Sequence, residues 1–424
     1  MRAVIKNATE THYGNLIWMP PYLYPKYELE KAIKAMETMG YYISCFPEGD
    51  GLCFKHETKP EKEIFNDFKV NFRWMVIKEY SRGEEFNFQK DILDYQIIIM
   101  PISRLRCENI IHAGKYSIYP NDEFPFNTIN IKASKNPLRD HVTSLTQVSV
   151  DTYRSHPIIV FTTKLIDHDS YNSMDQTQDE GLIKKLSQET DLIMDLVKYY
   201  HGEYFHPEYM VANTGLWAEK YSTAMIYFPK QNVAHIQARE VEVKTFIKSL
   251  GIDLIHNDFI EINPMLNFEI NETGNIAKHA LRLNSTILET DDLTMKFSMI
   301  MTLFEHMANP YEYEKFQIVK GKIGLHATSN KTNYHKLMQR FEELTAGLKK
   351  NDGSKDRILG VRTSIIHLGK RIEDLIPIKE NQKKLFEELQ SYTKSVIDDM
   401  ISFSHLTWDE FELEREKLKL NLKI

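Results

Sequence analysis

Residues 290–310 read TDDLTMKFSMIMTLFEHMANP and predict a helix with both ends marked. Apolar side chains recur along it at helical spacing, at Leu293, Phe297, Ile300, Phe304 and Met307. The residues 290–292 supply a capping side chain and first-turn acids, and Asn309-Pro310 ends the helix because proline cannot continue it. We therefore expect a helix with one buried face, which neighbouring helices must cover.

The rest of the chain after residue 276 repeats this helical pattern, and strand signals disappear from it. Apolar stripes predict helices within 316–325, 337–348, 358–372 and 385–400, with Asp356 as a cap for the third of these. The tail 408–424 is a charged amphipathic helix that can dock on the others or pair with another chain. Residues 276–424 are thus expected to form an all-α bundle.

Residues 1–275 are predicted to form strands more than helices. Short β-branched and aromatic segments predict strands, at 41–46, 72–80, 96–102, 127–132, 157–165, 224–228 and 235–243. The polar stretch 167–180 is expected to be a loop and a place where this module divides, and one helix is expected over 182–197. The predicted fold class is therefore α+β, with a sheet-rich N-terminal module (1–275) followed by the helical bundle (276–424).

Composition excludes several classes of protein. The chain of 424 residues has 53 lysines and arginines against 60 aspartates and glutamates, a formal net charge of −7, so it is not a polybasic nucleic-acid-binding protein as a whole. Three cysteines, Cys45, Cys53 and Cys107, are too few for a disulfide framework. The start of the chain lacks a signal peptide pattern, and no apolar stretch is long enough to span a bilayer. We expect a cytoplasmic protein without a membrane partner.

Common catalytic motifs are missing: the sequence contains no GxGxxG, Walker, HExxH or GxSxG pattern. Two polar clusters resemble metal ligand sets, 167–169 (Asp-His-Asp) and the group of Asp253, His256 and Asp258. We interpret both as turn formers and surface residues, and the pair His201 and His206 as packed or surface histidines. No metal or cofactor is therefore expected.

The most informative segment is Arg362-Thr363-Ser364-Ile365-Ile366-His367, which has the form R-x4-H. Imidazole can transfer a proton near neutral pH, and guanidinium can donate two parallel hydrogen bonds to a phosphate. On one helix, five positions rise by about 7.5 Å, a distance that the long arginine side chain can bridge. This pair is a candidate phosphodiester site. A second match to this kind of spacing, Arg106 and His112, lies among predicted strands, and we interpret it as coincidental.

The segment 280–401 resembles a HEPN domain (higher eukaryotes and prokaryotes nucleotide-binding), of the ApeA-like group found in bacterial anti-phage proteins. The resemblance rests on an apolar helix that ends in an acid, here Leu303-Phe304-Glu305-His306-Met307, and on a later R-S-x-I-V-H-like motif, here 362–367. It implies a homodimer in which two R-x4-6-H helices form a metal-independent ribonuclease site. Arg362 would stabilise the transition state and His367 would be the general acid or base, oriented by Glu305, Thr363 or Ser364.

The resemblance also implies an RNA substrate, tRNA or mRNA, and a role in abortive infection, with the N-terminal module sensing a phage-derived trigger or holding the enzyme inactive. Charge agrees with an RNA substrate, because residues 311–371 carry 13 lysines and arginines against 6 acids, a net +7. Two alternatives remain open. The bundle could be a non-enzymatic dimerisation or nucleotide-binding scaffold in which Arg362 pairs with Glu305, or the N-terminal module could be an enzyme of its own.

Overall fold

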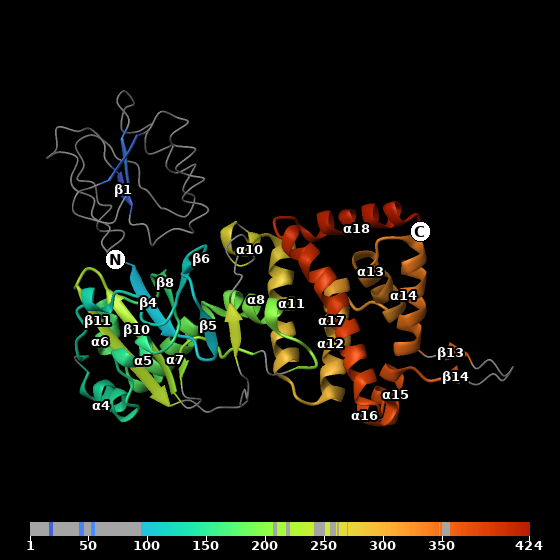
Figure 1. Cartoon of the computed structure of the whole chain (residues 1–424), viewed down its shortest axis with the longest axis horizontal. Coiled ribbons are helices and arrows are strands. Elements are labelled where there is room, and N and C mark those ends of the chain that lie inside the picture. Colours follow the sequence, from blue (N-terminus) through green and yellow to red (C-terminus); the bar gives the residue numbers. More distant parts are fainter. Residues whose placement is uncertain are drawn as a thin grey trace. The chain divides into compact units, whose positions relative to one another are not determined.

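The computed structural model describes the strands 17–19, 42–45 and 52–55, and then the ranges 95–134, 136–206, 210–217, 221–240, 251–254, 260, 263–268, 270–346, 348–349 and 357–424. The strand predicted at 72–80 lies outside them. The chain forms two compact units (Figure 1). Unit 1 comprises Met1–Thr190, Ala212–Phe246 and Asp253–Leu266, and unit 2 comprises Asp191–Val211, Ile247–Ile252 and Asn267–Ile424. An antiparallel sheet region is therefore followed by a helical region, as expected for an α+β chain.

Unit 1 is built on a seven-stranded antiparallel sheet in the order β11-β10-β4-β8-β7-β6, with β9 beside β10. Its strands are β4 (Gln96–Pro101), β6 (Ile111–Ala113), β7 (Tyr116–Tyr119), β8 (Ile158–Thr163), β9 (Leu216–Trp217), β10 (Tyr221–Phe228) and β11 (Val233–Glu240). The further strands are β5 (Leu105–Cys107) and β12 (Ile252–Leu254), and a separate small sheet has the order β1 (Ile17–Met19), β3 (Leu52–Lys55), β2 (Tyr42–Cys45).

Both faces of the central strands are buried. Successive residues of a strand point to opposite faces, yet Ile98 and Ile99 on β4 are both fully buried. The covering helices are α4 (Pro137–Leu145), α5 (Val150–Arg154), α6 (His168–Ser173) and α7 (Gln176–Gln188). Of these, α4 packs on β11, α5 on β4, and α7 on β10 and β11.

Two sequence-based expectations for unit 1 are wrong. Residues 127–132 hold the end of a 3-10 helix, Phe126–Thr128, and a single bridge from Ile131 to Ala234 instead of a strand. The stretch 167–180 is not a loop, because Asp167 caps α6 and Asp175 caps α7 through side-chain hydrogen bonds to backbone N–H groups. The polar residues that indicated a loop are in fact the helix caps.

A buried charge cluster fixes these helices to the sheet. Arg139 of α4 and Arg239 of β11 both bind the carboxylate of Asp179 on α7, and Arg139 reaches it at 2.5 Å. The three side chains are at most 4% exposed. Arg139 also donates to the carbonyl oxygen of Tyr171 on α6 at 2.7 Å and stacks over its ring. Because the two guanidinium groups share one carboxylate, the cluster depends on Asp179.

We predict that Asp179→Asn lowers the free energy of unfolding of unit 1 by about 3–5 kcal/mol, because it leaves two buried guanidinium groups without a negative partner. Urea denaturation followed by circular dichroism measures this. Asp169→Asn is the matched control, since that side chain is fully exposed. A loss below about 1 kcal/mol for Asp179→Asn would contradict the central role of the cluster.

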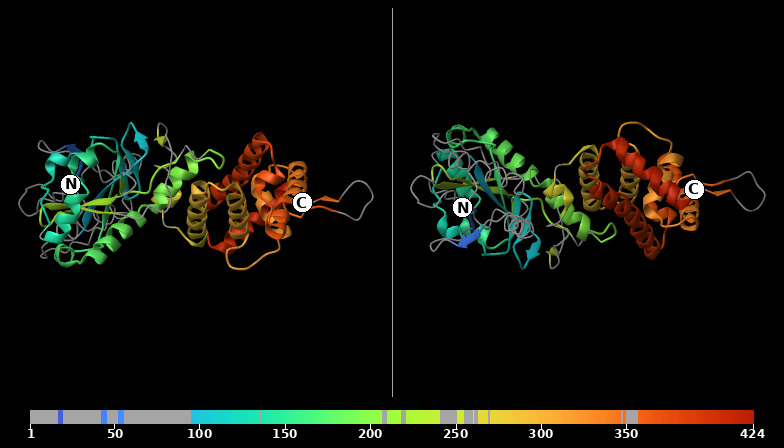
Figure 2. Two further views of the ribbon diagram at one scale, coloured as in Figure 1. Left: turned by 90° about the horizontal axis from the view of Figure 1, so that it is seen from below. Right: turned by 90° about the horizontal axis from the view of Figure 1, so that it is seen from above.

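Unit 2 is a helical bundle, seen from two further sides in Figure 2. Its helices are α8 (Asp191–His201), α11 (Glu272–Glu289), α12 (Leu293–Ala308), α13 (Phe316–Ala327), α14 (Lys331–Leu344), α15 (Val361–Leu368), α16 (Ile372–Leu375), α17 (Lys379–Ser402) and α18 (Trp408–Leu422). The short helix α10 (Pro264–Asn267) contains the point in the chain, after Leu266, at which unit 1 ends and unit 2 resumes. The helix predicted from the stretch 290–310 is confirmed: Asp292 caps it, and Phe297, Ile300, Phe304 and Met307 are fully buried.

The boundary between the units differs from the one expected at 275/276. The apolar stripe 182–197 spans two helices, and the second of them, α8, packs on α11 in unit 2. The Lys198 ammonium is 2.7 Å from Glu289 of α11, and the hydroxyl of Tyr199 donates to Asp398 of α17 at 2.8 Å. Such contacts between residues far apart in the sequence join α8 to unit 2.

Two helices are shorter than the apolar stripes 337–348 and 358–372 predicted. Leu348 lies in β13 (Leu348–Lys349), which pairs with β14 (Arg357–Ile358), and α15 starts only at Val361 with Gly360 as its N-cap. The stripe that continued to Ile372 is interrupted by Gly369, which adopts a left-handed φ of 63° and donates to the carbonyl oxygens of Ile365 and Ser364. Ile372 belongs to α16, and Leu368 is exposed.

The C-terminal helix α18 docks on the bundle through Arg415, which is 2% exposed. Its guanidinium donates to the carbonyl oxygens of Met307 and Ala308, at 2.6 and 3.0 Å, and so satisfies the last turn of α12. Its Nε donates to Nε2 of His326 on α13 at 3.0 Å, while Nδ1 of His326 is 2.7 Å from the carboxylate of Asp399 on α17. Arg415 therefore joins α18 directly to α12 and α13, and His326 extends the network to α17.

This network predicts a loss of stability in mild acid. Burial lowers the pKa of His326 from its ordinary 6.5, and the Nε–H of Arg415 occupies the nitrogen that a second proton would need. Because the unfolded histidine binds a proton at higher pH than the folded one, the unfolded state gains protons as the pH falls below about 6.5. The melting temperature of the helical unit should fall between pH 7.5 and 5.5, and this fall should be shallower in His326→Gln.

The control is His335→Gln on α14, an exposed histidine of the same unit, which should keep the slope of the wild type. Differential scanning calorimetry across the pH series distinguishes the variants. An unchanged slope in His326→Gln would show that other groups cause the acid sensitivity.

Candidate functional site

The R-x4-H segment forms α15, a short helix held by its neighbours at both ends. At its start, the hydroxyl of Thr363 donates to the carbonyl oxygen of Thr345, which is the C-cap of α14, at 2.6 Å. At its end, Gly369 closes the helix and Lys370 N–H donates to the carbonyl oxygen of Ser364. The position of α15 is therefore set by backbone and hydroxyl contacts of residues beside Arg362 and His367.

Arg362 is joined to the acid that the sequence analysis placed with it. Its Nη2 is 2.8 Å from Oε1 of Glu305 on α12, and the two side chains are 31% and 28% exposed. The guanidinium also lies over the ring of Phe316 on α13, with its central carbon 5.2 Å from the ring centroid. Glu305 and Phe316 together hold the arginine side chain from two helices.

The other three predicted site residues are placed differently. His367 is exposed, and no described residue forms a hydrogen bond or an ion pair with it. Ser364 is 4% exposed, and the hydroxyl of Thr363 is used by Thr345. In the described residues, neither Thr363 nor Ser364 is hydrogen-bonded to Arg362 or His367. Thr363 ties α15 to α14, and Ser364 is buried. Within one chain, the structure brings together Arg362 and Glu305 but does not join His367 to them.

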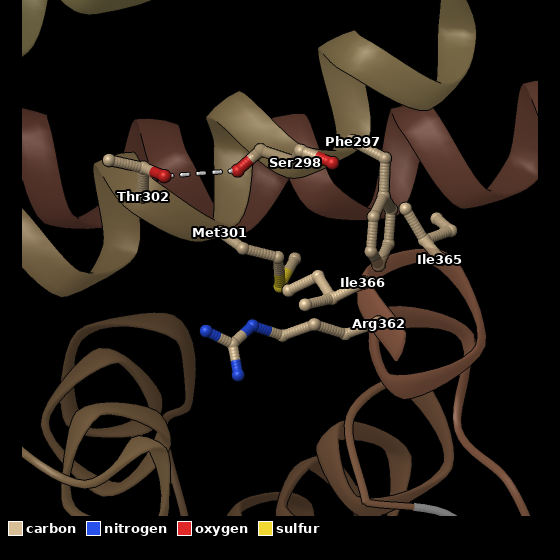
Figure 3. Close-up of a pocket in the computed structure, with 7 residues that line it drawn as sticks. All are labelled: Phe297, Ser298, Met301, Thr302, Arg362, Ile365 and Ile366. Carbon is tan, nitrogen blue, oxygen red and sulfur yellow. Dashed lines mark hydrogen bonds between the residues drawn. The ribbon is translucent and has the colours of Figure 1, made fainter. Parts of the chain in front are cut away.

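A pocket of about 90 Å³ opens beside Arg362 between α12 and α15 (Figure 3). It is lined by Phe297, Ser298, Met301, Thr302, Arg362, Ile365 and Ile366. From the sequence, α12 was expected to supply core residues such as Phe297, and none of its residues was expected to line a pocket. Their spacing was a usable signal: 297, 298, 301 and 302 lie on one helical face, one turn or two before Glu305.

The positive charge of the window 311–371 is partly neutralised by acids from other segments. Lys322 pairs with Glu314 and Glu412, and Arg340 binds Glu343 and Glu388. Arg371 contacts Asp292 at 3.0 Å. Three of these acids, Glu412, Glu388 and Asp292, lie outside the window, so the net charge of the sequence overstates the positive surface at the site.

The alternative polar clusters have structural roles in the described residues. Asp167 caps α6, and His168 stacks on His235 with ring centroids 5.5 Å apart. Arg106 contacts Glu108 and Asp253, and Nδ1 of His112 is 2.9 Å from the Ser117 hydroxyl. His206 packs edge-on against Phe205, and His201 lies in the last turn of α8. His256 and Asp258 lie outside the described residues.

The described residues contain no group of three or more histidine, cysteine or acidic side chains arranged to hold a metal ion. In the same residues, no helix combines the length and the hydrophobicity that crossing a bilayer requires. Comparison with protein-family models, curated proteins and solved structures found no match for this chain. The HEPN resemblance therefore rests on the residues quoted for it.

The exposure of the Arg362–Glu305 pair predicts how little it stabilises the fold. Since both side chains are about one-third exposed, we expect Glu305→Gln to lower the free energy of unfolding by less than about 1 kcal/mol. Glu388→Gln is a matched comparison, because Glu388 binds Arg340 through both carboxylate oxygens and accepts from the Tyr392 hydroxyl, and it should cost more. Chemical denaturation of both variants measures this. A loss above 2 kcal/mol for Glu305→Gln would identify the pair as a structural brace.

Proposed function

We propose that this chain is a metal-independent endoribonuclease of the HEPN type that acts in anti-phage defence. The observation that supports this most is the placement of Arg362: a guanidinium held by Glu305 and Phe316, still one-third exposed, and lining an open pocket. Such a group can bind a phosphodiester without moving. His367 is exposed on the same short helix, where it can meet a substrate.

In this proposal Arg362 stabilises the negative charge that builds on the phosphate oxygens during cleavage. Its Nη2 donates to Glu305, which leaves Nη1 available for a phosphate, since no described residue accepts from it. His367 acts as general acid or base on the ribose 2′-hydroxyl or the leaving 5′-oxygen. Because His367 is not joined to Arg362 within the chain, the complete site requires two copies, with His367 of one protomer facing Arg362 of its partner.

The proposed substrate is tRNA or mRNA in the cytoplasm, and unit 1 is proposed to hold the enzyme inactive until it meets a phage-derived trigger. These roles follow from the resemblance and from the order of the two units. The sheet of unit 1 carries its own buried charge cluster and core, so it is built as a separate folding unit that can respond independently.

One observation favours a second function, a non-enzymatic HEPN scaffold for dimerisation or nucleotide binding. Arg362 and Glu305 pair within one chain, as a structural bridge between α12 and α15 would. In that case neither Arg362 nor His367 carries out chemistry, and their removal changes stability or assembly only.

The test compares wild type, Arg362→Ala and His367→Ala on total RNA in the presence of EDTA. Loss of either group should lower the cleavage rate by at least about 100-fold, because each stabilises the transition state. Arg371→Ala and His335→Ala are matched controls, since they remove an exposed arginine and an exposed histidine of the same unit. Both should cleave as the wild type does.

Cleavage should be assayed without and with a lysate of phage-infected cells, because the proposal includes a trigger. If wild type leaves RNA intact in both conditions, or if both active-site variants keep full activity, the ribonuclease proposal is wrong. Inert wild type that still forms a dimer sensitive to Arg362→Ala would support the scaffold instead.

A further inference from the structure

Arg362 occupies a position where a positive charge is disfavoured. It is the second residue of α15, and the N-terminal turn of a helix carries partial positive charge on its free N–H groups. The contact with Glu305 offsets this repulsion, but the two side chains are 31% and 28% exposed, and ion pairs at such exposure hold long side chains only weakly. A second contact is therefore needed to keep the guanidinium in one place.

The ring of Phe316, the first residue of α13, supplies that contact. The central carbon of the guanidinium lies 5.2 Å from the ring centroid, within the range of about 6 Å over which the negative face of an aromatic ring attracts a cation. Glu305 binds the outer nitrogen Nη2, whereas the ring lies against the central carbon. Because these contacts come from α12 and α13 and act on different atoms, together they restrict rotation of the side chain more than either does alone.

The aromatic core of the bundle holds the ring of Phe316 in turn. Its centroid is 6.3 Å from that of Phe341 on α14, with the ring planes at 62°, which is an edge-to-face pair. Phe341 is fully buried and makes a second edge-to-face contact with Phe304 of α12, at 5.9 Å and 82°. Since Phe304 directly precedes Glu305 in α12, Phe341 links the two residues that contact Arg362.

The aliphatic neighbours of Arg362 do not set its direction. Ile365 and Ile366 line the pocket together with it, but Figure 3 shows the outer nitrogens of Arg362 extended away from both isoleucines. An aliphatic side chain in place of Phe316 would fill space without attracting the guanidinium, because only an aromatic ring has a negatively charged face.

We infer that Phe316 is a positioning residue for the proposed ribonuclease reaction, which holds the Arg362 guanidinium ready for the phosphate by cation–π attraction. The inference rests on the proposed function and adds to its site a residue that the sequence did not indicate. Phe316 acts through Arg362 and not on the RNA. A guanidinium that is held before the substrate arrives stabilises the charge of the transition state without first having to be ordered.

The test replaces Phe316 in the full-length chain with leucine and with phenylalanines that carry increasing numbers of fluorine atoms on the ring. Fluorine withdraws charge from the ring face, so it weakens the attraction for a cation while the ring stays apolar and similar in shape. The kcat for RNA cleavage in EDTA should fall with each added fluorine, to about one-fifth for Phe316→pentafluorophenylalanine and for Phe316→Leu. KM should change by less than about twofold, because the charge that Arg362 stabilises builds up in the transition state.

The same replacements at Phe403 are the matched controls, because this half-buried ring packs against the ring of Phe411 on α18. They should leave kcat unchanged. Circular dichroism melts confirm that each variant folds.

A second readout follows Arg362 directly. Phenylglyoxal modifies accessible guanidinium groups, and mass spectrometry measures the labelling of each arginine. Arg362 should be labelled faster in the leucine and pentafluorophenylalanine variants than in wild type, since its side chain is held less firmly. Arg371, whose side chain is 61% exposed, is the reference within the same chain.

The outcomes separate this inference from the proposed function. If kcat is constant across the fluorine series while wild-type cleavage depends on Arg362 and His367, Phe316 only packs, and the ribonuclease proposal stands without it. A rise in KM alone would show that the ring binds RNA, and an unchanged ratio of Arg362 to Arg371 labelling would show that it does not hold the arginine; either result overturns the inference. If wild type cleaves no RNA, with or without infected-cell lysate, the proposed function fails and the positioning role fails with it.

Discussion

The arrangement of the helical unit depends on one buried side chain, Arg415. A guanidinium at 2% exposure is costly to bury, and it is tolerated because the last carbonyl groups of α12, a neutral histidine and Glu412 accept its hydrogens. The rings of Trp408 and Phe411 cover its face. The end of α12 that it holds is only one turn from Glu305, so the packing of the C-terminal helix determines where the acidic partner of Arg362 lies.

The candidate site is assembled from elements that are each fixed by such contacts. Glu305 comes from a long helix with a filled core stripe, and Arg362 from a short helix tied to α14 by Thr363. The pair itself is too exposed to stabilise the fold much. The pair matters for the candidate site because it holds the Arg362 guanidinium beside a pocket. Nη2 of this guanidinium donates to Glu305, and no described residue accepts from Nη1.

Unit 1 also contains a buried charged side chain that binds several elements. Asp179 receives two arginines from separate elements, and the covering helices are thereby fixed on a sheet that is buried on both faces. In both units, one buried charged side chain has partners on several elements, and these contacts hold the elements together. The sheet also packs on a hydrophobic cluster made by residues of unit 1.

Local elements with a strong periodicity could be predicted from the order of residues alone. The helix 293–308 and its caps, the helical tail and the strands β2, β4, β8, β10 and β11 follow from residue spacing, because these signals depend on neighbours within a few residues. The family resemblance also brought Glu305 and Arg362 together, and these two side chains form an ion pair in the structure. Only the tertiary structure decided that α8 belongs to unit 2, that Gly369 ends α15, and that Thr363 and Ser364 face inward. Those outcomes depend on hydrogen bonds and packing between residues far apart in the chain, which no local pattern records.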